Sequence, residues 1–288
     1  MRPVRGWLVR LENAAALDAV VSPVQRVVRK VLAPGRVRDT LHGVDIGHPA
    51  HPILVQATIG SLASGTVCDL IGEDRAARRL IGLGLLSAVP AASAGIADWS
   101  EQHEQQMRTG LVHWGSNLVA LSLYGASLVS RHRGRSTAAR RLSLTGLAVL
   151  GASGFLGGDI AFRQAGGANH AEQVRHLVGP GWHTVGPVSD FPAGQASRRA
   201  VAGVGIVVVR GESGIDVLAN ECSHLSGPLC DGVLTSSGGD RCLVCPWHGS
   251  TFRLRDGAVV HGPATAAQPV FETRVREGSL QVRLPNAG

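Results

Sequence analysis

Four stretches of the chain carry no charged residue for about the length of a membrane-crossing helix. They are residues 49–68, 80–97, 109–130 and 142–158. A helix needs about 20 mostly apolar residues to cross the hydrocarbon core of a bilayer. A soluble helix of that length usually carries charges on its exposed face. The pattern therefore predicts four transmembrane helices.

These stretches are rich in glycine, alanine and serine rather than in large apolar residues. Small residues let helices approach closely in lipid, and Ser61 with Gly65 and Gly154 with Gly158 have the spacing that favours such contacts. We therefore expect a compact four-helix bundle in a transmembrane domain of residues 46–163.

The pattern changes after residue 180. Residues 164–180 are rich in glycine and predict a flexible linker, and residues 181–288 form a second predicted domain. Short β-rich segments separated mostly by glycine-containing turns follow at 204–210, 215–219, 241–244, 251–254, 270–275 and 280–284. Six short strands in about a hundred residues predict an antiparallel sandwich or small barrel. The expected fold class is α + β, in two domains.

Residues 1–45 predict an amphipathic helical tail. Apolar residues recur with helical spacing over 7–21 and 24–32, with Ser22 and Pro23 between the two segments. Basic residues alternate with valines in the second segment. Two interpretations stay open, since such a helix can lie on a membrane surface or pack against a neighbouring domain.

The net charge of +7 lies entirely before residue 181, because the remainder holds nine basic and nine acidic residues. Long uncharged stretches interrupt the basic part, which favours membrane flanks and argues against nucleic-acid binding. Arginines crowd the loops after the first and third stretches, whereas the loop after the second is mostly acidic. The positive-inside rule then places both termini outside the cytoplasm. Arg140-Arg141 before the last stretch is similar to a twin-arginine export signal.

Two short motifs near the C-terminus each combine a cysteine with a histidine. They are Cys222-Ser-His224 and Cys245-Pro-Trp-His248. Two thiolates and two imidazoles suit either zinc or a [2Fe-2S] cluster with two cysteines and two histidines. Each motif supplies one ligand of each kind, which favours the two-iron cluster.

The residues around these motifs resemble a Rieske iron-sulfur domain over about residues 181–288. The matching segments are C-S-H-L-S-G-P-L, C-P-W-H-G-S-T-F and Gly262-Pro263-Ala264. The resemblance implies that Cys222 and Cys245 bind the inner iron and that His224 and His248 bind the outer one. It also implies that Ser250 donates a hydrogen bond to a cluster sulfur.

Three positions differ from those of the high-potential members of the Rieske family. Gly227 and Trp247 stand where those members carry a disulfide, and Phe252 stands where they carry a tyrosine that donates to a ligand cysteine. The resemblance therefore implies a ferredoxin-like member with an intermediate reduction potential. Cys230 and Cys242 are expected to be ordinary thiols, although Cys242 with Cys245 also has zinc or redox spacing.

Residues 40–165 are similar to a four-helix integral-membrane family of unassigned function that is sometimes fused to Rieske domains, through the segment G-H-P-A-H-P at Gly47. Candidates for a second site, for haem b or a metal, are His48, His51 and His113. These lie on the same predicted membrane side as His103, and His51 and His113 begin two different helices, as two axial ligands would.

We expect a membrane-anchored one-electron carrier that works as the electron-transfer component of an oxidoreductase system. Its partners would be a redox protein that gives or takes electrons and the lipid of the cell membrane. A Rieske subunit of a quinol-oxidising cytochrome bc-type complex and a non-catalytic redox sensor remain alternatives. An oxygenase domain, with its own iron site, is not expected in this chain. The sequence does not indicate an oligomeric state.

Overall fold

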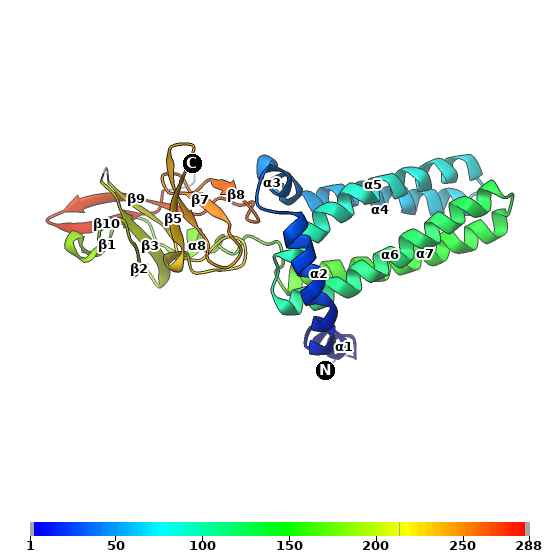
Figure 1. Ribbon diagram of the computed structural model, residues 1–288, viewed down its shortest axis with the longest axis horizontal. Helices are drawn as coiled ribbons and strands as arrows, with labels where there is room; N and C mark the ends of the chain where they lie inside the picture. The colour runs from blue at the N-terminus through cyan, green and yellow to red at the C-terminus, as the bar shows by residue number, and fades with distance from the viewer. Residues whose placement is uncertain (1–2, 213, 286–288) are drawn as a thin grey trace. The chain divides into compact units, whose positions relative to one another are not determined.

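The computed structural model describes residues 3–212 and 214–285 (Figure 1). The chain divides into two compact units. The membrane unit consists of Met1–Ala33 and Pro49–Gly166, and the β unit consists of Pro34–His48 and Gly167–Gly288. The chain therefore passes between the units at three places.

Four long helices dominate the membrane unit (Figure 1). They are α4 (Ala50–Leu70), α5 (Asp74–Ser100), α6 (Glu104–His132) and α7 (Ser136–Gly158). A π-helical turn, Asp159–Arg163, continues α7. With lengths between 21 and 29 residues, these helices extend for about 30 to 44 Å at 1.5 Å per residue. That length suffices to cross the hydrocarbon core of a bilayer.

Three of these helices are long and apolar enough to cross a membrane by length and composition: α4, α5 and α7 with its π-helical turn. The sequence predicted a fourth span in α6. That helix is present, with 29 residues, but it does not reach the same apolarity. Glutamine, histidine, asparagine and serine side chains along it lower its mean hydropathy.

Two helical hairpins, α4–α5 and α6–α7, share one packing pattern at a shift of 62 residues. Leu62 of α4 packs against Gly84 of α5, and Tyr124 of α6 packs against Gly146 of α7. A methyl group added to Gly84 or to Gly146 would lie 2.6 Å or 3.0 Å from those side chains. The membrane unit therefore contains an internal repeat, which was not among the sequence-based predictions.

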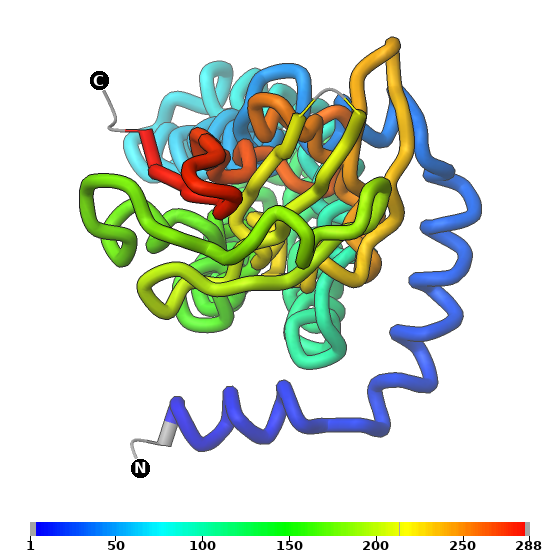
Figure 2. The backbone as a smooth tube through the Cα atoms, turned by 90° about the vertical axis from the view of Figure 1, so that its left-hand side faces the viewer, coloured from blue at the N-terminus to red at the C-terminus, as the bar shows by residue number. Residues whose placement is uncertain are grey.

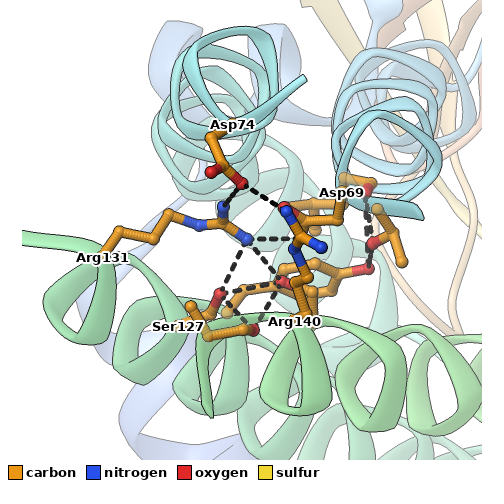
Figure 3. A network of polar contacts seen from close by, with 10 residues as sticks. Asp69, Asp74, Ser127, Arg131 and Arg140 are labelled. Atoms are coloured by element: carbon orange, nitrogen blue, oxygen red, sulfur yellow. Dashed lines mark hydrogen bonds and ion pairs between the residues drawn. The ribbon is translucent and has the colours of Figure 1, made fainter. Parts of the chain in front are cut away.

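A buried ion-pair network joins the hairpins at the ends of α4 and α6 (Figure 3). Arg131 donates to the fully buried carboxylate of Asp69. Arg140 pairs with Asp74 at 3.2 Å. Asp69 and Arg131 are themselves 62 residues apart, so the repeat places opposite charges at equivalent positions. Two of the arginines that suggested a cytoplasmic side thus also hold helices together.

The N-terminal tail forms α1 (Pro3–Glu12) and α2 (Asp18–Val31), with a bend between them that Figure 2 shows. The predicted break at Ser22-Pro23 is wrong, because Pro23 lies inside α2 and the break falls before Asp18. A proline inside a helix removes one backbone hydrogen bond and crowds the carbonyl four residues earlier, and α2 continues through Pro23 nevertheless.

One face of α2 packs against the long helices α5 and α6 of its own unit. Val21 and Val28 share an apolar cluster with Trp99 and Met107, and Arg108 donates to Asp18 at 2.7 and 2.6 Å. These contacts support the interpretation in which this helix packs against a neighbouring element.

The β unit holds two antiparallel sheets in its described residues. The first has six strands in the order β1-β10-β9-β4-β3-β2 and the second has four in the order β5-β6-β7-β8. The strands are β1 (His183–Pro187), β2 (Ala196–Val201), β3 (Val204–Arg210), β4 (Ile215–Ala219), β5 (Val233–Ser237), β6 (Asp240–Val244), β7 (Thr251–Arg253), β8 (Val259–His261), β9 (Val270–Arg276) and β10 (Ser279–Arg283). The predicted antiparallel β domain is confirmed.

Alternation along β3 supplies both apolar cores of the β unit. Ile206 and Val208 face one cluster, with Phe271 of β9, whereas Val207 and Val209 face the other, with Phe252 of β7. Successive side chains of a strand point to opposite faces. The second cluster also contains the two cysteines of the ligand motifs, so the candidate site rests directly on this core.

Two segments outside the sheets also belong to the β unit. Within the predicted linker, helix α8 (Val174–Leu177) places Val174 in the first core, next to Val178. Three apolar residues of the segment expected to be flexible, Ala171, Val174 and Val178, are therefore buried.

The other segment, Pro34–His48, precedes the first long helix and is called the strap below. It contains α3 (Arg36–His42) and a 3-10 turn, Val44–Ile46. Asp39 accepts a hydrogen bond from the backbone amide of Gly262 at 2.9 Å and contacts His261 Nδ1 at 2.9 Å. The strap is thus joined to the loop that follows β8.

Candidate metal centre

Two loops carry the cysteine and histidine motifs, and both have the same backbone hydrogen bonds. In the loop after β4, the amide of Ser226 donates to the carbonyl of Cys222 at 2.9 Å, and the amide of Cys222 donates to the carbonyl of Gly227 at 2.9 Å. In the loop after β6, Gly249 donates to Cys245 at 3.1 Å, and Cys245 donates to Ser250 at 2.8 Å. Each cysteine therefore begins the same tight turn.

The fifth residue of each turn has a left-handed conformation. Gly249 has a φ of 78°, and Ser226 has a φ of 61°. Glycine adopts this conformation readily, whereas another residue is disfavoured by about 1–2 kcal/mol. Ser226 gains a compensating contact, because its Oγ lies 3.1 Å from His170 Nδ1. A residue of the predicted linker, His170, thus supports the first loop.

The turns bring the four predicted ligands together as two pairs. Cys222 and Cys245 are buried, and their side chains are hydrogen-bonded to each other. The rings of His224 and His248 are half-buried, with centroids 5.1 Å apart at an interplanar angle of 85°. The two sulfurs form one pair and the two imidazoles form the other.

Backbone amides stabilise negative charge at both sulfurs. The amides of His224 and Leu225 donate to the Cys222 sulfur, and those of Trp247 and His248 donate to the Cys245 sulfur. The hydrogen bond from Cys222 is the main cause that lowers the pKa of Cys245 to about 7, against the opposing effect of burial. The same hydrogen bond, with burial, raises the pKa of Cys222. The site is therefore prepared to hold thiolate.

Close approach of the two loops requires Gly227. A methyl group added there would lie 2.7 Å from the Cys245 sulfur and 3.3 Å from the Trp247 ring. Trp247 itself is half exposed. The positions that carry a disulfide in the high-potential members are thus in direct contact here without one.

A third loop closes the site from the other side. The Ser250 hydroxyl accepts a hydrogen bond from the backbone amide of Ala264 at 2.9 Å, and Ser250 is fully buried. Phe252 is also fully buried, with no polar atom on its ring. Since Asp39 of the strap holds Gly262, the strap supports the third loop as well.

This arrangement fits a [2Fe-2S] cluster with two different irons. One iron would take the sulfur pair and the other the imidazole pair, and the amides directed at the sulfurs suit thiolate ligands. Within the described ranges, no group of three or more His, Cys, Asp or Glu side chains surrounds a single point. Two ligands at each iron are what a two-iron cluster needs.

Comparison with known proteins gives the same result. Residues 181–272 match the Rieske [2Fe-2S] domain family. A 3-phenylpropionate/cinnamic acid dioxygenase ferredoxin subunit of Escherichia coli K12 is 30% identical over 102 residues, which are 35% of this chain and 92% of that protein. The chain belongs to the Rieske [2Fe-2S] family.

The Rieske domain of this chain also resembles part of a larger protein. The oxygenase component of a probable 3-ketosteroid-9-alpha-monooxygenase from Rhodococcus rhodochrous is 33% identical over 96 residues, and the chain spans 23% of that protein. Among solved structures, the ferredoxin of carbazole 1,9a-dioxygenase from Nocardioides aromaticivorans IC177 matches with a TM-score of 0.34 and 23% identity, over 36% of this chain and 98% of that one.

Residues 47–170 match a second family, of predicted membrane proteins, DUF2231. The expected fusion of a membrane domain with a Rieske domain is confirmed by these two matches. The predicted fold class, helices followed by an antiparallel β domain, agrees with them.

The remaining cysteines are free thiols. Cys242 is fully buried in the Rieske domain and Cys230 is half-buried. Burial is the main cause that raises the pKa of each thiol. Cys68 lies in α4. The spacing of Cys242 and Cys245 also allowed a C-x-x-C zinc or redox motif. In the structure Cys242 lies within β6, whereas Cys245 begins the ligand loop after it.

The histidines of the predicted second site fall in different units. His51 and His113 belong to the membrane unit, whereas His48 belongs to the strap and so to the β unit. His51 Nδ1 lies 2.8 Å from the Ala91 carbonyl, and His113 Nδ1 lies 2.7 Å from the Ser153 carbonyl. Sequence analysis did not find Asp39, His170 or Ser226. Ser226 stands in the C-S-H-L-S-G-P-L segment, where no role was assigned to it, whereas Asp39 and His170 stand in no motif and only the fold brings them to the ligand loops.

Proposed function

We propose that this protein is a membrane-anchored one-electron carrier whose Rieske domain passes electrons between a redox protein that donates them and another that accepts them. The observation that carries the proposal is the pairing of two buried cysteines with two half-buried imidazoles. The membrane unit supplies the anchor.

The four ligands would divide the work between them. Cys222 and Cys245 would hold the inner iron on the apolar core, and His224 and His248 would hold the outer iron near the surface. When bound, the cluster supplies a group that accepts and releases one electron. Trp247 and Pro246 are exposed beside His248, which offers a partly apolar surface on which a partner can dock.

The ferredoxin relative from Escherichia coli is named as a subunit of a dioxygenase. By analogy, we propose a protein partner in an oxidoreductase system as the donor or acceptor here. Affinity capture of the full chain from membranes, with mass spectrometry, would identify that partner. A reversible one-electron couple in voltammetry would support a carrier, whereas an irreversible or inaccessible couple would contradict it and favour a sensor.

The residues around the ligands support an intermediate reduction potential. The Ser250 hydroxyl accepts from Ala264, so its own hydrogen remains able to point towards the cluster sulfur. Phe252 offers no donor. Hydrogen bonds to the sulfurs tune the potential of such clusters. We therefore expect Phe252→Tyr to raise the potential and Ser250→Ala to lower it in a redox titration. A wild-type value near the top of the family range would instead favour the quinol-oxidising alternative.

We propose an extracytoplasmic Rieske domain, because the arginines gather in the loops after α4 and α6. Ser236 is exposed near the end of β5. A cysteine placed there, Ser236→Cys, should react with a membrane-impermeant maleimide on intact cells more strongly than the unsubstituted chain does. Reaction only after permeabilisation would place the domain in the cytoplasm.

We further propose haem b as a second cofactor, separate from the cluster. Its candidate ligands, His51 and His113, both belong to the membrane unit.

A further inference from the structure

Two histidines of the membrane unit stand at equivalent positions of its internal repeat. His51 lies in the first turn of α4, and His113 lies 62 residues later in α6. Their Nδ1 atoms contact the carbonyls of Ala91 and Ser153 at 2.8 and 2.7 Å. These carbonyls are also 62 residues apart, one in α5 and the other in α7. Both hairpins therefore hold a histidine in the same way.

These contacts determine which ring nitrogen carries the proton. A carbonyl oxygen only accepts hydrogen bonds, so Nδ1 is the protonated nitrogen of each neutral ring and Nε2 keeps its lone pair. The side-chain amide of Asn117 agrees with this, because its nitrogen lies 3.1 Å from His113 Nε2 and can donate to it. Metal-binding histidines have the same arrangement, with the other ring nitrogen donating to a backbone carbonyl.

Each ring rests on a glycine of the neighbouring helix. A methyl group added to Gly95 would lie 2.7 Å from the His51 ring, and one added to Gly157 would lie 3.0 Å from the His113 ring. Gly95 and Gly157 are again 62 residues apart. Gly154, one turn before Gly157, has nothing within 4 Å of the added group. The glycines at these two positions thus leave room for the imidazole rings.

The two imidazoles come from the two hairpins of the repeat, His51 from α4 and His113 from α6. Both residues are half-buried. The repeat therefore presents two imidazoles with the same tautomer from two different helices.

The number of ligands decides what this pair can bind. A bare zinc ion takes four ligands, and catalytic zinc sites still use three from the protein. The described residues contain no group of three or more His, Cys, Asp or Glu side chains about one point. Haem brings four nitrogens of its own and takes histidine as an axial ligand. Two imidazoles complete its coordination.

We propose that His51 and His113 are the two axial ligands of a haem b held between the hairpins α4–α5 and α6–α7. Binding would replace the Asn117 contact at His113 Nε2 with the iron. The proposal rests on the repeat and on the orientation of the two rings, and it stands whether or not the Rieske domain acts as a carrier.

The test uses the full chain, purified from membranes in detergent and titrated with hemin. We expect saturation at about one haem per chain, with a Soret band of a low-spin six-coordinate haem. His51→Ala and His113→Ala should each abolish the six-coordinate spectrum. Gly157→Ala should weaken hemin binding by about 10–100-fold, as loss of a group that orients a ligand does. Gly154→Ala is the matched control and should bind hemin as the wild type does.

Circular dichroism reports the folding of the helices in every variant, the Rieske EPR signal reports the folding of the β unit, and neither should change. Absence of a Soret band after hemin addition to the wild type would overturn the proposal. So would hemin binding that survives the double substitution of both histidines, because the haem would then bind elsewhere. Equal effects of Gly157→Ala and Gly154→Ala would contradict the role given to the ring-supporting glycine. The redox couple of the cluster is measured separately, so failure of these tests would not count against the proposed carrier function.

Discussion

Gly227→Ala is the most direct test of the ligand loops, because the change adds one methyl group at the contact between them. The added carbon would lie 2.7 Å from the Cys245 sulfur. Gly227 has no left-handed φ, so alanine does not strain the backbone there. The effect of the substitution is therefore the contact itself.

The size of the displacement follows from the geometry. Non-bonded carbon contacts are comfortable at about 3.5–4.0 Å, so the methyl group and the sulfur must separate by about 1 Å. Metal sites tolerate errors in ligand distance of only about 0.2 Å. The sulfur cannot turn aside freely, because the amides of Trp247 and His248 hold it. We expect loss of the cluster, together with about 1–3 kcal/mol of stability as for other overpacked positions.

The assay is the iron content per chain together with the EPR spectrum of the reduced protein. Gly179→Ala is the control, because Gly179 is exposed and a methyl group there meets nothing within 4 Å. Circular dichroism would show that the β unit still folds in both variants. Full iron content and an unchanged EPR spectrum in Gly227→Ala would refute the proposed geometry of the two loops.

Three further predictions concern the rest of the chain. Asp69→Asn should lower the stability of the bundle by about 3–5 kcal/mol, because it leaves a buried arginine without its charge partner. Asp74→Asn, at a half-exposed position, should cost no more than about 1 kcal/mol; equal thermal unfolding midpoints in detergent would contradict this. Cys230 and Cys242 should react slowly with iodoacetamide at pH 7, because burial raises both thiol pKa values and only the thiolate reacts. Rapid labelling of the folded protein in mass spectrometry would count against this. Hydrogen bonding to an arginine lowers the pKa of Asp18, so its stabilising effect should be present at neutral pH and lost as the pH falls through that lowered value. The unfolding midpoints of the wild type and Asp18→Asn should therefore differ at pH 7 and converge in acid, and a constant difference would disprove the coupling.

The metal centre was predictable where the chemistry lies in short motifs. Cys222, His224, Cys245 and His248 are separated by two and three positions in their loops, so local spacing predicted that each pair would act together. The supporting residues could not be found in this way. Ser226 takes a left-handed conformation that favours glycine. The contact with His170 that supports it forms only because residues 171–178 pack against the β unit.

The membrane unit was predictable both as helices and as a repeat, although only the helices were predicted. Uncharged stretches indicate spans by their length, whichever apolar residues they contain. The repeat is also present in the sequence, because A-A-R-R-L occurs at 76–80 and again at 138–142, and His51, Gly84 and Gly95 recur 62 residues later. Contacts such as Leu62 with Gly84 and Tyr124 with Gly146 become apparent only in the fold.

The strap has a consequence for how often the chain crosses the membrane. Because Asp39 is hydrogen-bonded to Gly262, residues 34–48 and the Rieske domain lie on the same aqueous side. A chain that leaves one side at Pro49 and returns to it by Gly166 must cross an even number of times. Three of the long helices are apolar enough to cross by length and composition, so we expect α6 to be the fourth span. Its polar side chains would then face the inside of the bundle, where Ser127 and Arg131 lie buried.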